Sequence, residues 1–257
     1  MKTKFTICSP PYTDKSAGIW ILHFLCDRLN HLGYPATINT MINPSSIVNP
    51  KFHTPLSYDP DSIVVYPEIV LGNPLGADKV VRYLLCHELV PINWGELDFP
   101  LSYSKVFRDD CDILYYPIAD LDLFYSDGRK REGYCVYRGK SFYTGPLPIS
   151  DNSVEITRSW PESKHELAEI LRSKQFLFTL DNITSTALDA ALCGCVPLYS
   201  EPAYESGELG KFWMNDISEL SEMQIEVTAL HEKVRVLQNS FDERLETIVH
   251  KILRHFV

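Results

Sequence analysis

The fold is decided by the stretch "FLFTLDNITSTALDAALCGCVPLY", which runs from Phe176 to Tyr199. It begins with strand-forming residues, passes through a polar turn and an alanine- and leucine-rich segment, and ends in a second apolar run after Gly194. This order predicts a strand, a helix and a second strand parallel to the first. Ligands of α/β proteins bind at the carboxyl ends of such strands, so the polar turn is a candidate site.

The same alternation of strand and helix extends to both sides of this stretch. Further strands are predicted in short apolar runs at residues 4–8, 34–39, 61–69 and 112–119, and residues 134–143 predict a strand followed by a turn. Helices are predicted where apolar residues recur every three or four positions, at residues 19–33, after a glycine- and proline-containing loop within 72–89, and at 159–174. The sequence therefore indicates parallel sheets that are covered by helices.

Two features predict how the chain is divided. The polar stretch "LFYSDGRKREG" at residues 123–133 interrupts the alternation and predicts a boundary near residue 130. The tail from Leu220 to Phe256 has helical periodicity, and Ser240-x-x-Glu243 reads as a capping box that separates two helices. We therefore expect an α/β protein with two Rossmann-like domains, residues 1–130 and 131–257, and a helical C-terminal tail.

Composition excludes several classes of protein. The formal net charge of -10 argues against binding to nucleic acid, whose phosphates favour basic surfaces. No apolar run is long enough for a signal peptide or a membrane span, which favours a cytoplasmic protein. The seven cysteines are scattered, mostly within apolar runs, so we expect free thiols that pack as small hydrophobic side chains.

The polar turn of the opening stretch contains Asp181, Asn182, Thr184 and Ser185. At the start of a helix, free backbone N–H groups and the positive end of the helix dipole favour an anion, and small hydroxyl side chains let a phosphate approach. Asp181 or Thr184 can equally be a simple N-cap residue. The turn by itself leaves both interpretations open.

A basic segment precedes this turn in the chain. Residues 126–140 contain five basic and two acidic residues within an acidic protein, which suggests a bound phosphate or diphosphate. Arg129 to Arg131 are also explained by a solvated linker. Arg138 and Lys140 follow a predicted strand and flank a glycine, where their side chains can point toward a ligand.

The spacing of two aspartates in the opening stretch resembles a motif of the GT-B type of Leloir glycosyltransferases. These enzymes carry E-x7-E in the C-terminal domain, after a strand and across a helix start, followed by a small-residue ending. Here the motif reads Asp181-x7-Asp189, and Gly194 and Pro197 stand in the ending. The segment "IVVYPEIVLGNPLGADKVVRYLLC" is similar to glycosyltransferases that build bacterial surface polysaccharides.

The resemblance implies transfer of a sugar from a nucleotide-sugar donor to an acceptor hydroxyl, with two domains flanking a cleft. It implies that Asp189 binds the ribose, that Asp181 lies near the donor sugar, and that Arg138 and Lys140 hold the diphosphate. It implies no cofactor and no metal, since cations of the protein neutralise the diphosphate. Both glutamates of the family motif are aspartates here, which shortens each reach by one methylene.

The resemblance also assigns the N-terminal half to the acceptor. The implied acceptor is a glycan or a lipid-linked group used in polysaccharide or glycoconjugate synthesis, which allows peripheral contact with a membrane. Gly18, at the start of a predicted helix, and Asn73, in the loop after a strand, are placed on the acceptor side. Turn formation alone would also explain Asn73.

Three side chains are candidates for aligning or activating the acceptor hydroxyl: Glu68, Asp181 and His23. Glu68 directly follows a predicted strand, where a carboxylate can act as a base, and a solvated loop carboxylate explains it equally well. His23 has apolar neighbours in a predicted helix and can be a core histidine instead. The sequence does not choose between the three.

Two other functions remain open. Asp110 and Asp112 form a D-x-D pair, which in metal-dependent transferases of another fold holds a cation that bridges the diphosphate. In this chain the pair precedes a predicted strand, and an exposed acidic turn explains it as well. The second possibility is a non-catalytic nucleotide-binding subunit, which the shortened acidic side chains of the motif would suit.

Overall fold

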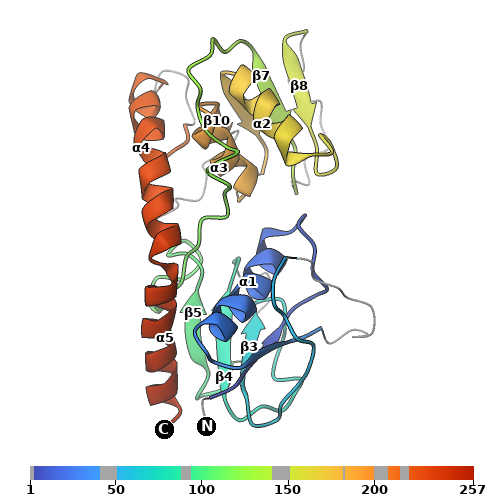
Figure 1. Ribbon diagram of the computed structural model, residues 1–257, viewed down its shortest axis with the longest axis vertical. Coiled ribbons are helices and arrows are strands. Elements are labelled where there is room, and N and C mark those ends of the chain that lie inside the picture. Colours follow the sequence, from blue (N-terminus) through green and yellow to red (C-terminus); the bar gives the residue numbers. More distant parts are fainter. Residues whose placement is uncertain are drawn as a thin grey trace. The chain divides into compact units, whose positions relative to one another are not determined.

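Two parallel sheets organise the computed structural model, which describes residues 3–40, 51–87, 94–140, 151–181, 183–199, 208–214 and 220–257. The chain divides into two units, each built on one sheet (Figure 1). Unit 1 comprises Met1–Tyr116 and Asn239–Val257, and unit 2 comprises Pro117–Gln238. The boundary expected near residue 130 therefore falls inside unit 2, and the last residues of the chain belong to unit 1.

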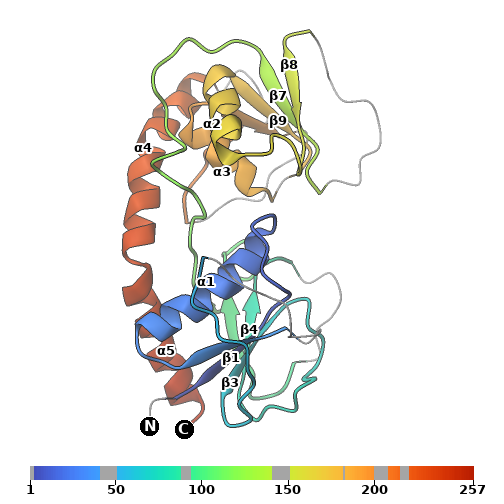
Figure 2. The ribbon, with the colours of Figure 1, turned by 45° about the vertical axis from the view of Figure 1, so that its right-hand side comes forward.

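Unit 1 contains six parallel strands among its described residues, in the order β2-β1-β3-β4-β5-β6. The strands are β1 (Phe5–Cys8), β2 (Ala36–Asn39), β3 (Ile63–Pro67), β4 (Val80–Leu84), β5 (Phe99–Ser102) and β6 (Asp112–Ile113). Every residue of β1, β3 and β4 is buried, as expected for central strands of a parallel sheet. Helix α1 (Ala17–His31) packs on β1 and β2 (Figure 2).

The prediction of a helix within residues 72–89 is wrong, because the apolar run in this segment forms β4. A run as short as "VVRYL" fits a buried strand and a buried helix equally, and pairing with β3 and β5 decides the outcome. The connection from β3 to β4 is a loop stabilised by Arg82, whose guanidinium donates to the carbonyls of Val70 and Gly72 and pairs with Asp98. The strand predicted at 112–119 is confirmed only for β6, and β5 was not predicted.

Helix α5 (Phe241–His255) completes unit 1. Its buried side chains recur at helical spacing: Phe241, Leu245, Ile248, Val249 and Ile252. The ring of Phe241 lies 5.1 Å from that of Phe24 in α1, and Arg28 forms a bidentate pair with Asp242. At the other end, the ring of His255 packs edge-on against that of Phe99 in β5. Figure 1 shows α5 beside β5. The end of the chain is therefore part of the N-terminal unit.

The predicted division of the tail at Ser240 is confirmed, but its predicted cause is wrong. Helix α4 (Leu220–Asn239) ends one residue before Ser240, and α5 begins one residue after it. The Ser240 side chain makes no capping hydrogen bond, and its Oγ accepts from Arg244 Nε at 3.3 Å instead. Among the described residues, no helix is both long and apolar enough to cross a membrane.

Unit 2 contains four parallel strands among its described residues, in the order β10-β9-β7-β8. They are β7 (Tyr134–Tyr137), β8 (Ser153–Ile156), β9 (Phe176–Thr179) and β10 (Val196–Tyr199), and helices α2 (Lys164–Ser173) and α3 (Ser185–Leu192) precede β9 and β10. The predicted strand–helix–strand unit at 176–199 is confirmed, with β9 and β10 paired from Phe176 and Val196 onward. Helix α2 begins later than predicted, at the capping box of Ser163 and Glu166.

Small side chains bring α3 close to the sheet of unit 2. Ala187, Ala190 and Ala191 are fully buried, as are Cys193 and Cys195 at the helix end. All seven cysteines are free thiols, and five of them are buried. Burial raises the pKa of the Cys193 thiol to about 12, so this group is an inert part of the core, as the sequence predicted.

Candidate functional site

The carboxyl ends of β7 and β9 lie side by side in unit 2, because the two strands pair from Tyr134 and Phe176 to Tyr137 and Thr179. The chain leaves β7 through the turn Arg138–Gly139–Lys140 and leaves β9 through the turn that leads to α3. Two segments that are about forty residues apart in the sequence therefore meet at one edge of the sheet. This juxtaposition is the candidate site.

Asp181 joins these two turns. Its Oδ2 accepts a hydrogen bond from the Lys140 backbone N–H at 2.9 Å, and its Oδ1 accepts one from the Ile183 N–H at 3.3 Å. Its own N–H donates to Thr179 Oγ1 at 3.0 Å. With 8% of its surface exposed, Asp181 acts as a bridge between two loops in this structure.

Gly139 permits this bridge. Its φ of +59° lies in the left-handed region, and a Cβ at this position would lie 2.3 Å from Asp181 Oδ2 and 2.5 Å from Asp181 Cβ. Real Cβ atoms do not approach other atoms so closely, so a larger residue would have to displace the aspartate. The turn residues and Asp181 are therefore matched in shape.

The start of α3 lies in the same turn. Thr184 is the N-cap residue, with extended backbone angles and its Oγ1 accepting from the Thr186 N–H at 3.2 Å. The capping interpretation of Thr184 is thus correct, and it is compatible with an anion at the same helix start. Ser185 is the first helical residue and is exposed. Asn182 lies outside the described residues.

Asp189 lies one turn further along α3 and is 8% exposed. Burial raises the pKa of its carboxyl group to about 7, with Lys164 acting to lower it and Asp120 to raise it. Among the described residues, no hydrogen-bond donor reaches the carboxylate. A buried carboxylate of this kind is stabilised by any ligand that brings hydroxyl donors to it.

The basic segment at 126–140 is split between opposite ends of the sheet. Arg129 pairs with Asp127 and Glu169, and Arg131 Nη2 donates to the Cys193 carbonyl at the end of α3. These residues precede β7, whereas Arg138 and Lys140 follow it. Arg138 and Lys140 therefore lie at the carboxyl end of β7, whereas Arg129 and Arg131 lie at its other end and contact other residues of unit 2.

Sequence reasoning missed Trp160. It lies in the turn after β8, the strand beside β7, and 45% of its surface is exposed. The Trp160 N–H donates to Thr157 Oγ1 at 2.9 Å, and the Thr157 N–H donates to the Trp160 carbonyl at 2.8 Å, which together hold the turn. A tryptophan within a polar stretch is the signal in the sequence, but the sequence predicts a helix from residue 159 and does not predict the strand β8 that precedes Trp160.

Glu68 in unit 1 occupies a position similar to that of Asp181. It directly follows β3, and its Oε2 accepts from the Leu85 N–H, just after the neighbouring strand β4, at 2.9 Å. Gly18 lies nearby in the first turn of α1, since a Cβ at Gly18 would lie 3.6 Å from Leu85 Cδ1. The structure thus brings these two candidates together through Leu85.

The other two candidates of unit 1, His23 and Asn73, contact nearby residues of the same unit. His23 has no exposed surface, contacts the Pro10 carbonyl through Nε2 at 3.1 Å and packs edge-on against Tyr12. Burial lowers its pKa, which favours the neutral ring. The Asn73 side chain accepts from the Ala77 N–H and donates to the Ala77 carbonyl, so it closes its own loop.

The D-x-D pair is held by two different cations. Asp110 pairs with Arg108 and Asp112 pairs with Lys251, each at 2.5 Å. Each carboxylate therefore has its own cationic partner in this structure. In the described residues no cluster of three or more His, Cys, Asp or Glu side chains has the arrangement of a metal site.

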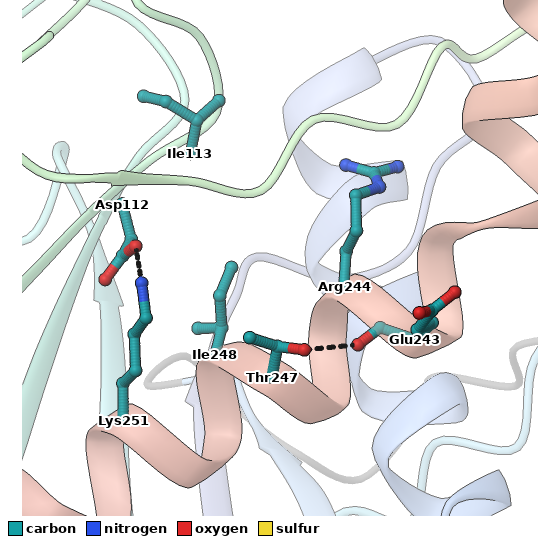
Figure 3. Close-up of a pocket in the computed structure, with 7 residues that line it drawn as sticks. All are labelled: Asp112, Ile113, Glu243, Arg244, Thr247, Ile248 and Lys251. Atoms are coloured by element: carbon teal, nitrogen blue, oxygen red, sulfur yellow. Dashed lines mark hydrogen bonds and ion pairs between the residues drawn. The ribbon is translucent and has the colours of Figure 1, made fainter.

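Asp112 also lines a hollow of about 320 Å³ between β6 and α5 (Figure 3). The remaining lining residues are Ile113, Glu243, Arg244, Thr247, Ile248 and Lys251. Figure 3 shows the Lys251 ammonium turned toward Asp112, and the Thr247 hydroxyl donating to the Glu243 carbonyl. None of the residues predicted to bind the donor or the acceptor lines this hollow.

Comparison with known proteins gives matches to solved structures alone. No family model and no curated protein matches the sequence. A DNA-modifying β-glucosyltransferase, solved in the presence and absence of uridine diphosphoglucose, is 12% identical with a TM-score of 0.53 and covers 97% of this chain and 99% of its own. The T4 phage β-glucosyltransferase in complex with UDP and Mn²⁺ is 14% identical with a TM-score of 0.51, covering 98% and 99%.

The spinosyn forosaminyltransferase SpnP gives a third match, at 10% identity and a TM-score of 0.50, covering 97% of this chain and 100% of its own. All three are glycosyltransferases whose fold is of the GT-B type. At identities this low the likeness shows the fold alone. The expectation of a GT-B-like α/β fold is thereby confirmed, whereas the resemblance to enzymes of bacterial surface polysaccharides finds no support in these matches.

Proposed function

We propose that this protein is a glycosyltransferase whose nucleotide-sugar donor binds at the carboxyl edge of the sheet of unit 2. The observation that carries the proposal is the meeting of the Arg138–Lys140 turn with Asp181 and the start of α3, where β7 and β9 end side by side. The GT-B fold supports it. Because two of the matching structures are described with UDP or its glucose derivative, UDP is the first nucleotide to test.

Charge at this edge suits a leaving diphosphate. Glycosyl transfer passes through an oxocarbenium-like state, so the departing diphosphate needs stabilisation. Arg138 and Lys140 would supply positive charge, and the start of α3 at Thr184 and Ser185 would supply backbone N–H groups and the positive end of a helix dipole. No acidic residue lies in the first turn of α3, and the Asp181 carboxylate in the turn before it is bonded to the backbone N–H groups of Lys140 and Ile183.

Asp189 and Trp160 would bind the nucleoside. The buried Asp189 carboxylate lacks hydrogen-bond donors among the described residues, and the ribose hydroxyls would provide them. The half-exposed indole of Trp160 follows the strand next to β7, and an aromatic ring at this position can stack on a nucleobase. Asn182, from the same turn as Asp181, stays in the proposal on its sequence position.

For the acceptor side in unit 1, Glu68 is a better candidate base than His23. Glu68 is half-buried at the carboxyl end of β3, whereas His23 has no exposed surface with which to touch a substrate. Gly18 lies beside the same Leu85 as Glu68, so it remains an acceptor-side candidate. Asn73 is the weakest of the set, because its amide closes its own loop.

The proposed acceptor is a hydroxyl of a glycan or a lipid-linked group, in glycoconjugate or bacterial polysaccharide synthesis. Unit 1 has 12 basic and 15 acidic residues, and unit 2 has 12 and 19, so neither unit carries the positive charge typical of DNA-binding domains. This charge balance argues for an acceptor other than DNA. A cytoplasmic location, with peripheral contact to a membrane where a lipid-linked acceptor is used, fits this role.

A thermal-shift screen with UDP, GDP, CDP and dTDP, and with their sugars, tests the proposal. We expect one nucleotide series to raise the melting temperature, and its sugar to be hydrolysed slowly without an acceptor. Binding without hydrolysis would favour the non-catalytic subunit. Loss of turnover in EDTA, restored by manganese, would favour the metal-dependent alternative at Asp110 and Asp112. No shift with any nucleotide would overturn the proposal.

A further inference from the structure

A side-chain carboxylate joins the two turns at the carboxyl edge of the sheet of unit 2. The Asp181 Oδ2 reaches across from the end of β9 to the Lys140 N–H just after β7. The same side chain accepts from the Ile183 N–H through its other oxygen. Both oxygens of Asp181 are therefore engaged with backbone groups of the protein, and 92% of its surface is covered.

We infer that Asp181 is a positioning residue, which holds the Arg138–Lys140 turn in the shape that binds the donor diphosphate, with Gly139 as its required counterpart. The inference rests on the proposed function and assigns Asp181 a role other than the sugar contact that the family resemblance implies. One backbone N–H group already occupies each oxygen of Asp181, and 8% of the residue is exposed, so the contacts that the structure shows for this carboxylate are those that join the two turns.

The fit with Gly139 shows that the contact is specific. A Cβ at Gly139 would meet three atoms of Asp181 within 2.8 Å, and no residue other than Asp181 is among its three nearest neighbours. Gly128, in the same unit, has a similar left-handed φ of +76°, but a Cβ there would meet nothing within 4 Å. The two glycines therefore share backbone conformation and differ in this one contact.

The consequence for binding follows from preorganisation. A short turn with two cationic side chains loses conformational freedom when it closes on a diphosphate, and that loss weakens binding. A turn already fixed through Lys140 N–H avoids the loss and places both cations before the ligand arrives. Disturbing the bridge should therefore weaken diphosphate binding without removing either cation.

The experiment uses the full chain with four variants: Gly139→Ala, Asp181→Asn, Asp181→Ala and the control Gly128→Ala. Asp181→Asn replaces one carboxylate oxygen by an NH₂ group that cannot accept from a backbone N–H. Affinity is measured by calorimetry for UDP, GDP, CDP and dTDP, and by NMR titration for the matching nucleosides. The comparison of diphosphate with nucleoside separates placement of the turn from general damage to the fold.

We expect Gly139→Ala and Asp181→Asn each to weaken binding of the diphosphate by about tenfold or more, the size of one lost hydrogen bond to a charged group. Nucleoside affinity should stay within about twofold, and Gly128→Ala should change neither by more than that. A double-mutant cycle of Gly139→Ala and Asp181→Ala, followed by melting temperature, adds a second test. In the Asp181→Ala background, Gly139→Ala should cost no more stability than Gly128→Ala does in the natural chain.

Three results would overturn the inference. Equal losses of diphosphate and nucleoside affinity would make the bridge purely structural. Additive melting-temperature changes for Gly139→Ala and Asp181→Ala would show that the two residues do not act together. Undiminished diphosphate affinity in both single variants would remove Asp181 from any role in binding. If the natural chain binds none of the four diphosphates, the proposed function itself fails, which is a separate outcome.

Discussion

At the carboxyl edges of both sheets, an acidic side chain connects the ends of two neighbouring strands, but the residues around it differ between the units. In unit 1, Glu68 after β3 accepts from the Leu85 N–H after β4, and in unit 2, Asp181 after β9 accepts from the Lys140 N–H after β7. Each acidic side chain thus ties the ends of two neighbouring parallel strands. In unit 2 the partner is a basic turn beside the start of α3, where we propose that an anion binds.

In unit 1 the corresponding region is built around a buried cation of its own. The connection from β3 to β4 is a loop, and Arg82 fills the space under it with 1% of its side chain exposed. The comparison teaches that a strand-end carboxylate identifies an edge of the sheet but not a binding site. The groups beside the carboxylate decide whether the edge binds a ligand or only stabilises the fold.

The largest expected effect is a loss of stability in unit 1 when Arg82 is replaced. Arg82→Met removes the partner of the nearly buried Asp98 and the donors to the Val70 and Gly72 carbonyls. We expect a loss of about 3–5 kcal/mol in the free energy of unfolding, because one buried charge is left unpaired. Urea denaturation measures it. Lys4→Met, which removes an exposed pair with Asp59, is the control and should cost far less. A loss no larger than in the control would mean that Arg82 does not stabilise the loop.

The second prediction concerns the buried carboxyl group in unit 2. The folded-state pKa of Asp189 is about 7, above the unfolded value of about 3.9, so the folded protein binds the proton more tightly. The free energy of unfolding therefore falls as pH rises from about 4 to 7. Asp189→Asn should therefore stabilise the protein by up to about 4 kcal/mol above pH 7, and much less at pH 4. Nucleotide affinity should fall at the same time.

Melting temperatures of both proteins across pH 4 to 8 check this. Stabilisation with lost affinity would identify Asp189 as a group kept for binding at a cost in stability. A variant that melts far below the natural chain at pH 8 would instead show that the carboxylate is structural, and the assignment to the ribose would fail.

The third prediction separates the two halves of the basic segment. Arg138→Ala or Lys140→Ala should each weaken nucleotide-diphosphate binding by about 1.5–3 kcal/mol, as expected for lost charge-assisted hydrogen bonds. Lys130→Ala is the matched control, since Lys130 belongs to the same basic segment but pairs with Glu132 before β7. Calorimetric titration measures all three. Equal losses in all three variants would mean that overall charge, rather than position at the edge, governs affinity.

The smallest expected effect distinguishes two helix starts. Thr184→Ala should lower the free energy of unfolding by about 1 kcal/mol, because the Thr184 side chain caps α3. Ser240→Ala should have a smaller effect, since Ser240 makes no capping hydrogen bond at the start of α5. Urea denaturation of both variants provides the comparison. A larger loss for Ser240→Ala would contradict the assignment of the caps.

The sequence by itself determined the elements whose signals are local. The strand–helix–strand unit at 176–199, helix α1 and the two terminal helices all follow from periodicities that neighbouring residues carry within one or two turns. It also determined the start of α3 at the Thr184 turn, because helix starts and small polar residues are recognised directly in the chain. The buried cysteines followed from their apolar neighbours.

The tertiary structure decided what depends on pairing between distant segments. The run "VVRYL" forms the strand β4 because it pairs with β3 on one side and with β5 on the other. The basic segment was split because β7, four residues long and about 13 Å from end to end, carries Arg131 and Arg138 to opposite edges of the sheet. The bridge from Asp181 to Lys140 exists only because β9 pairs with β7, and a pairing of strands forty residues apart is set by the packing of the whole unit rather than by any local pattern.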